Sequence, residues 1–265
     1  MHAISLTYID LGFASFLVVL LAALSFRFRL GLTKQIVIAA IRTFVQLAMV
    51  GYILRFVFAQ AGIGWVLVAS TGMLLMGGKE IRERQKNRLK GWWDFGVGTS
   101  AMFLSSFLLA TFTLRFIIEV EPFYAARYSL PILGMLLGNT MTGIALSLNY
   151  LTDATLQQRA TIEQRLLLGQ SKTRVMDQIR RDSIKIGMIP SINAMATAGI
   201  VNLPGMMTGQ ILAGSPPVEA VKYQILIMLL ISSGTGFGVM LAIGYTSRRF
   251  FDARHRLRID DLCDD

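Results

Sequence analysis

Long apolar runs separated by short charged segments dominate the chain. Seven of these runs approach the roughly 20 residues that a helix needs to cross a hydrocarbon core of about 30 Å. They cover residues 3–25, 35–56, 60–78, 92–118, 129–151, 184–203 and 221–245. The pattern predicts an all-α, polytopic membrane protein with about seven transmembrane helices in a single domain over residues 1–265.

The first run is expected to be a retained helix. No basic residues precede it, and its apolar part is long for the core of a cleaved signal peptide.

The basic residues indicate the orientation. Twenty-one of the 26 lie in four segments, and with seven spans all four segments fall on one side of the membrane. The positive-inside rule makes that side the cytoplasm, so we expect the N-terminus outside and the C-terminus inside. The four segments hold Arg27, Arg29 and Lys34; Lys79, Arg82, Arg84, Lys86, Arg88 and Lys90; Arg159, Arg165, Lys172, Arg174, Arg180, Arg181 and Lys185; and Arg248, Arg249, Arg254, Arg256 and Arg258. An even number of spans would destroy this segregation.

Composition supports a membrane protein and argues against a soluble one. Hydrophobic residues make up 54% of the chain and charged residues 16%, and the mean hydropathy is +0.55. Soluble domains carry roughly 25% charged residues. The net charge of +10 comes from clusters beside apolar runs, so the expected partner of these charges is the lipid bilayer and not nucleic acid.

Little side-chain chemistry is available. Cys263, His2 and His255 lie at or near the termini, which leaves no disulfide framework, zinc-type cluster or Cys/His nucleophile pair. The closest approach to a phosphate-binding P-loop, at residues 72–80, has the wrong spacing and lacks the hydroxyl residue. We therefore expect no catalytic residue, no bound cofactor and no enzyme activity in this chain alone.

A few polar residues within the spans are candidates for a translocation path. Asp10 is the one intramembrane acid that we single out, whereas Arg42 lies close enough to the cytoplasmic end of its span to extend towards the interface. Asn139 and Asn193 either line a path or join helices. Gly134 and Gly138 permit close helix contact, as does Gly138 with Thr142, and a glycine-rich patch at 232–238 is suited to bending.

The outer connection at 204–220 contains an apolar piece, 206–213, that is too short to span and includes the path candidates Met206 and Met207. It is read either as a re-entrant gate or as a hydrophobic plug. Ser215 is expected to cap the last helix, with Pro216 at its first position.

The inner connection at about 152–183 predicts a helix, a tight turn and a second helix. Gly169, Gln170 and Ser171 break the segment, with Gly169 expected at a positive φ and Ser171 as the N-cap of a helix running through Arg180. The pair either rests on anionic lipid or docks a cytosolic partner.

Six short runs, spread from the second span towards the C-terminus, carry a family resemblance. They are Leu203-Pro204-Gly205-Met206-Met207-Thr208-Gly209; Ala213-Gly214; Ala220-Val221-Lys222-Tyr223-Gln224-Ile225; Gln46-Leu47-x-x-Val50-Gly51-Tyr52; Gly138-Asn139; and Arg181-Asp182-Ser183-Ile184. Together they resemble the FetB-type iron-export permeases of ABC transporters. The resemblance implies a multi-pass permease subunit of the plasma membrane, the inner membrane in a bacterium, that serves iron export and metal homeostasis. Its partner would be a cytosolic ABC subunit that holds ATP and Mg. Plant relatives are associated with aluminium tolerance and nucleotide-sugar transport.

The resemblance also gives the inner segment a role. ABC importer permeases carry a docking loop of the form E-A-A-x-x-x-G, and residues 163–169 keep its Glu-to-Gly spacing but not its alanines. Candidate ATPase-docking residues are Glu163, Arg165, Gly169, Ser171 and Arg174. Because a path generally needs more than seven helices, a homodimer is expected.

The cargo and two other classes of function stay open. Fe²⁺ prefers His and carboxylate ligands, and the spans have no His, so the metal ligands are unknown. The ion either passes as a complex or meets a weak site of carbonyls, Asn and Asp10. The alternatives to an ABC permease are an ion-gradient-driven secondary transporter or channel, and a membrane scaffold or sensor.

Overall fold

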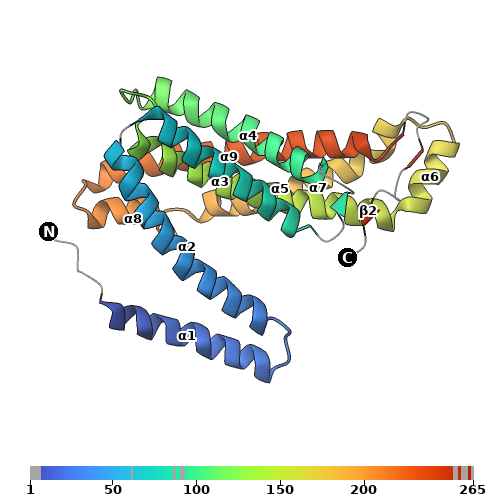
Figure 1. The fold of residues 1–265 in the computed structure, drawn as a ribbon. Coiled ribbons are helices and arrows are strands. Elements are labelled where there is room, and N and C mark those ends of the chain that lie inside the picture. Colours follow the sequence, from blue (N-terminus) through green and yellow to red (C-terminus); the bar gives the residue numbers. More distant parts are fainter. Residues whose placement is uncertain are drawn as a thin grey trace. The chain divides into compact units, whose positions relative to one another are not determined.

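The computed structural model describes residues 7–60, 62–85, 88–89, 93–252, 256–257 and 262–263. The chain divides into two compact units. One comprises residues 1–62 with 212–214, and the other comprises residues 63–211 and 215–265. Figure 1 shows the helices of both units. Lys86, Lys90, Arg254 and Arg258 of the basic segments, together with His2 and His255, lie outside the described residues.

The first unit is a helical hairpin of α1 (Tyr8–Arg27) and α2 (Thr33–Gln60). The connecting turn places Arg29 at φ 54° and Gly31 at φ 72°. Ala22 is buried on α1, and its carbonyl oxygen accepts a hydrogen bond from the Thr33 hydroxyl at 3.5 Å. Ser25 and Val57 are also buried, but most side chains of the hairpin are exposed, as expected of helices that meet lipid or further protein.

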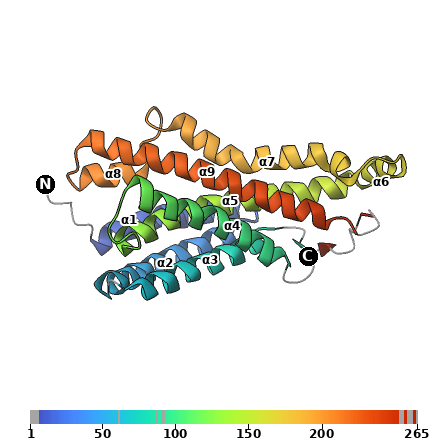
Figure 2. The same ribbon diagram turned by 90° about the horizontal axis from the view of Figure 1, so that it is seen from above.

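The second unit is a bundle of long helices built around α5. Its long elements are α3 (Ile63–Glu83), α4 (Trp93–Phe112) with the π-helix η1 (Thr113–Ile117), α5 (Ala126–Gln157), α7 (Lys172–Thr197) and α9 (Pro217–Arg249). Helix α5 contacts α3, α4, α7 and α9. The short helices α6 (Arg159–Leu167) and α8 (Gly205–Leu212) lie at opposite ends of this bundle in both views (Figures 1 and 2).

A small sheet joins two segments that are far apart in the sequence. Strand β1 (Arg88–Leu89) follows α3, and β2 (Leu262–Cys263) lies near the C-terminus. The two strands pair antiparallel, with Arg88 opposite Cys263. The C-terminal segment is thereby connected to the loop between α3 and α4.

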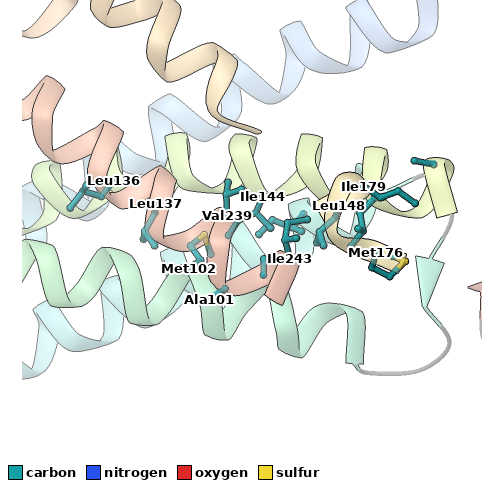
Figure 3. Close-up of a cluster of buried hydrophobic side chains, with 14 of the residues drawn as sticks. Ala101, Met102, Leu136, Leu137, Ile144, Leu148, Met176, Ile179, Val239 and Ile243 are labelled. Atoms are coloured by element: carbon teal, nitrogen blue, oxygen red, sulfur yellow. The ribbon is translucent and has the colours of Figure 1, made fainter. Parts of the chain in front are cut away.

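The core of the bundle is one continuous apolar cluster along α5. Ile144 and Leu148 of α5 lie among side chains from α4, α7 and α9 (Figure 3). Small residues let these helices approach closely. A Cβ on Gly238 of α9 would overlap Thr140 of α5 and lie 3.0 Å from the Ser105 hydroxyl oxygen of α4.

In the described part of the chain, five helices are long and apolar enough to cross a membrane. They are residues Ile9–Arg27, Thr33–Gln60, Phe95–Ile117, Ala126–Gln157 and Pro217–Arg249. The other two runs in the sequence, 60–78 and 184–203, fall largely within α3 and the second half of α7, which do not reach the same hydropathy threshold. An all-α, polytopic architecture agrees with these findings; the count of seven spans and the orientation stay predictions.

Some local expectations were wrong. The second inner helix runs through Arg180 as expected, but it is not separate from the next predicted span: α7 continues to Thr197 and includes most of residues 184–203. Ser215 is not the cap of α9: Pro216 is the N-cap, and the fixed φ of Pro217 suits the first helical position.

The glycines of α5 and α9 have different surroundings. Within the described part of the chain, no atom lies within 4 Å of a Cβ built on Gly138. Gly134 does approach α3, with the Met73 Cε atom 3.0 Å from its virtual Cβ. The patch at 232–238 is part of continuous α9, and Gly234 packs against Leu136.

Candidate functional site

The inner segment forms a helical hairpin, α6 and the start of α7, joined by a turn that backbone hydrogen bonds define. The Gln170 N–H donates to the Arg165 carbonyl at 3.1 Å, and the Gly169 N–H donates to the Leu166 carbonyl at 3.0 Å. This pair of bonds is the Schellman arrangement, which requires a left-handed residue after the helix end. Gly169 occupies it with φ 83°, as the sequence predicts.

The second helix of the hairpin begins as expected. Ser171 is the N-cap of α7 in extended conformation, and its hydroxyl oxygen accepts a hydrogen bond from the Arg174 N–H at 3.4 Å. This contact satisfies one of the amide groups that a helix start leaves unpaired. The turn and the cap together fix the direction in which α7 leaves α6.

One face of the hairpin is buried in the same apolar cluster as the bundle. Ile162 of α6 is 2% exposed, and it belongs to this cluster with Val175, Met176 and Ile179 of α7. Phe250 and Phe251 at the end of α9 belong to it as well. The hairpin is therefore a packed extension of the bundle.

The tip of the hairpin is apolar and exposed. Leu167 and Leu168 are 87% and 81% exposed. The Arg165 and Arg174 side chains beside this tip are also exposed. Glu163 is held within α6, because its carboxylate lies 2.9 Å from the Arg159 Nε atom. The free surface thus combines leucine side chains with positive charge.

Farther along α7, polar side chains form a short surface network. The Gln178 amide donates to the Asp182 carboxylate at 2.7 Å, and the Lys185 ammonium lies 3.0 Å from its other oxygen. The Gln178 hydrogen bond, followed by that from Lys185, holds the pKa of the Asp182 carboxyl below its ordinary value.

The Asp10 side chain caps the start of α1. Its carboxylate accepts hydrogen bonds from the Thr7 N–H at 2.8 Å and the Thr7 hydroxyl at 2.7 Å. The Thr7 hydroxyl oxygen accepts in turn from the Asp10 N–H, which completes a capping box. Asp10 thus helps to start α1, and its place in the path stays a prediction.

Asn139 and Asn193 are exposed and hydrogen-bond within their own helices. The Asn139 side-chain amide donates to the Met135 carbonyl of α5 at 2.8 Å. The main-chain carbonyl of Asn193 on α7 accepts from the Thr197 hydroxyl at 2.9 Å. Because both asparagines are exposed, they lie on the outer side of their helices.

Met206 and Met207 lie in the first turn of α8. Met207 is buried, and Met206 packs against the apolar cluster. The Met207 N–H donates to the side-chain oxygen of Gln224 on α9 at 3.3 Å, so α9 supplies an acceptor to the start of α8. The segment is a short helix packed on the bundle, and its role as a gate or a plug stays a prediction.

The structure places the docking candidates on one hairpin and the path candidates on four different helices. Glu163, Arg165, Gly169, Ser171 and Arg174 occupy one hairpin. The path candidates lie on α1, α5, α7 and α8, and no hydrogen bond between them occurs in the described part of the chain. In the described part of the chain, no group of three or more His, Cys, Asp or Glu side chains is placed to hold a metal ion.

The sequence did not reveal the residues whose role depends on a contact with a helix far away in the chain. Gly187 lies so close to α5 that a Cβ on it would be 2.8 Å from the Gly143 carbonyl oxygen, and the Gln224 side chain accepts from the Met207 N–H. A glycine or glutamine within an apolar helix gives no local sign of such contacts. The exposed Leu167 and Leu168 were visible as apolar residues, but their exposure depends on where the helix ends.

Helices long enough to span, an apolar core along α5 and a packed terminal hairpin define the class: an all-α, multi-pass membrane protein. Comparison with known proteins refines this class. Residues 8–251 match the model of an uncharacterised protein family, UPF0014. The chain belongs to this family.

The chain is similar to several named proteins over most of its length. It is 30% identical over 271 residues to the Probable iron export permease protein FetB of Escherichia coli, which covers 99% of each chain. It is 30% identical to the UPF0014 membrane protein STAR2 of Oryza sativa, covering 92% of this chain and 84% of that one. It is 34% identical to the protein ALUMINUM SENSITIVE 3 of Arabidopsis thaliana, covering 81% and 77%. No solved structure matches.

Proposed function

We propose that the chain is the permease subunit of an ABC transporter that exports iron or a related metal species. Two copies form the path, and separate cytosolic subunits bind ATP and Mg. The α6–α7 hairpin is the observation that carries this proposal. The relative named as an iron export permease supports the choice of cargo.

The length of α5 supports docking to a protein over resting on lipid. At 1.5 Å per residue its 32 residues extend about 48 Å, which exceeds a hydrocarbon core of about 30 Å by roughly 18 Å. With the outer end of α5 at the membrane boundary, α6 begins in the aqueous cytoplasm. Leu167 and Leu168 then face water, where two adjacent leucines gain by contact with a partner.

The continuity of α7 supports mechanical coupling. Its 26 residues run as one helix from the docking turn into the bundle, with Pro190 in the second half. Because a proline inside a helix removes one backbone hydrogen bond, a displacement of the hairpin moves the part of α7 before Pro190 as a unit. ATP binding closes the ATPase pair and draws the two hairpins together, and hydrolysis resets them. Cargo and nucleotide bias one two-state equilibrium, which alternates the access of the path.

The basic segments support the orientation. With seven spans, α3 and the second half of α7 cross the membrane, the N-terminus lies outside and the C-terminus lies in the cytoplasm of a bacterial inner membrane. The hairpin then lies on the same side as the expected ATPase. Asn139 and Asn193, both exposed on the bundle, are the path candidates best placed to face a second copy.

The decisive experiment is co-purification of the full chain with an ABC ATPase encoded beside it, followed by reconstitution in liposomes. We expect a stable complex that hydrolyses ATP and moves iron, and no ATP hydrolysis by the isolated chain. Robust flux driven by an ion gradient, with the permease alone, would contradict the proposal and favour a secondary transporter or channel.

Topology reporters test the orientation separately. A reporter fused after Asp265 is expected in the cytoplasm, and one inserted near Ser215 is expected outside. The opposite result at either site would place the hairpin on the wrong side for a cytosolic ATPase.

A further inference from the structure

Helix α2 carries two polar side chains within its expected membrane span that form no hydrogen bond or ion pair in the described α1–α2 hairpin. Arg42 and Gln46 are one turn apart, both are exposed, and neither has a hydrogen-bond or ion-pair partner within the α1–α2 hairpin as described. Thr43 differs, since its hydroxyl donates to the Ala39 carbonyl at 2.9 Å. Arg42 and Gln46 therefore leave charged and polar groups unsatisfied.

The depth of Gln46 makes this arrangement informative. Helix α2 has 28 residues, about 42 Å, and Gln46 lies at its midpoint, about 18 Å from Lys34. A hydrocarbon core is about 30 Å thick, so Gln46 is near its centre. Arg42 alone could extend to the cytoplasmic interface, as Arg55 can at the outer end. The shorter Gln46 side chain cannot.

The face that carries both residues is directed away from α1. Thr33, Ile36 and Ala40 are half-buried on the side of α2 that packs on α1, and the Thr33 hydroxyl reaches the Ala22 carbonyl there. At 100° per residue, Arg42 and Gln46 lie on the other side of the helix. An unpaired amide is costly in lipid, so this face meets a polar surface or water.

The charge on this face is uncompensated. Helix α2 contains Lys34, Arg42 and Arg55 and no acidic residue, and the one acid of α1 is engaged in its capping box. Guanidinium groups bind carboxylate and phosphate oxygens. A water-lined surface with a free guanidinium repels a bare metal cation and attracts an anion.

We propose that the Arg42–Gln46 face of α2 lines the translocation path and binds an anionic group of the cargo. This inference rests on the proposed transport function, and it specifies that function: the metal crosses as a complex whose ligands carry carboxylate or phosphate oxygens. Gln46 provides a neutral hydrogen-bonding group one turn deeper than the charge.

Cysteine labelling tests the proposal without knowledge of the cargo. The chain has one cysteine, Cys263, so Cys263→Ser provides a background for single reporters in the full-length protein in native membranes. Gln46→Cys and, one turn farther on the same side, Met49→Cys are the reporters. Phe44→Cys is the matched control at similar depth on the opposite face. The reagents are methanethiosulfonates that carry a sulfonate or a trimethylammonium group, with rates normalised to those for a free thiol.

We expect both reporters to react and Phe44→Cys to be protected from both reagents. At Gln46→Cys the sulfonate reagent should react about three- to tenfold faster than the cationic one, because Arg42 lies one turn away. Arg42→Gln should remove this preference, and Arg42→Lys should keep it. Membrane abundance and ATPase co-purification should stay normal in all variants.

Three results would overturn the proposal: no labelling at either reporter, equal labelling at Phe44→Cys, or a charge preference that does not depend on residue 42. Loss of the ATPase interaction in the parent protein would instead count against the proposed function, so the two failures are distinguishable.

Discussion

Gly143 of α5 and Gly187 of α7 meet backbone to backbone. A Cβ on Gly187 would lie 2.8 Å from the Gly143 carbonyl oxygen, and one on Gly143 would lie 2.9 Å from the Gly187 carbonyl oxygen. Val239 of α9 touches both positions. Helices α5, α7 and α9 therefore pack closely at two glycines. Helix α7, which also forms part of the docking hairpin, is held against the bundle at this point.

Gly187→Ala is predicted to destabilise the bundle. The new methyl group would meet a backbone oxygen and the Ser147 Cβ atom at 2.9 Å, neither of which can move without shifting a helix. Overpacking of this kind costs about 1–3 kcal/mol. The midpoint of heat-induced aggregation in detergent should fall. Gly244→Ala on α9 is the control, because no atom lies within 4 Å of its virtual Cβ; an equal loss there would show that the close approach is not the cause.

Hydropathy and local turn chemistry predicted most of the helices and the docking turn. Gly169 and Ser171 are local signals, because a left-handed residue followed by an N-cap needs no distant partner to be recognised. The continuity of α7 was missed because the charges at Arg180, Arg181 and Asp182 suggest an interruption. The apolar face continues through them at helical spacing, as the burial of Ile179, Ser183 and Gly187 shows; these residues lie on the packed side, and the charges lie outside it.

The path candidates show the limit of sequence reasoning. Asp10 was selected because an acid within a span is rare, yet a threonine three residues earlier uses it in a capping box. Polarity alone does not tell which side of a helix faces the core. For Asn139 and Asn193 the structure supplies that direction, and both point outward.

Gly169→Val is predicted to disrupt docking without disrupting membrane insertion. At φ 83° a β-branched side chain is strained, at a cost of about 1–3 kcal/mol, and the Schellman hydrogen bonds should be lost. Membrane abundance should stay normal because hydropathy governs insertion, whereas ATPase co-purification and transport should fall. Gly169→Asn is the control, since Asn tolerates this conformation. Full activity of Gly169→Val would mean that this turn is not needed for docking, and the 79–90 loop would be the next candidate for the ATPase contact.

Gln224→Leu is predicted to loosen α8. It removes the side-chain oxygen that accepts from the Met207 N–H, a contact worth about 0.5–1.5 kcal/mol. Amide hydrogen exchange in the first turn of α8 should accelerate by up to about tenfold, while exchange in α5 should not change. Lys222→Gln alters an exposed residue on the same helix and should have no effect on α8. Unchanged exchange in Gln224→Leu would mean that apolar packing of Met207 alone holds this helix.

The last prediction uses two apolar pairs of equal exposure at the two ends of the bundle. Leu167 and Leu168 at the hairpin tip are 87% and 81% exposed, and Ile200 and Val201 between α7 and α8 have the same two values. Replacing both residues of a pair by serine removes similar apolar area in each case. If the hairpin is the docking element, the Leu167→Ser/Leu168→Ser double variant should weaken ATPase binding at least tenfold, since a central apolar anchor contributes about 2 kcal/mol or more to an interface. The Ile200→Ser/Val201→Ser variant should bind normally.

Affinity can be measured with detergent-solubilised permease immobilised on a sensor surface. Equal affinities of the two variants would mean that the leucine pair does not anchor the ATPase, and weaker attachment of the leucine variant to anionic vesicles would identify lipid as its partner.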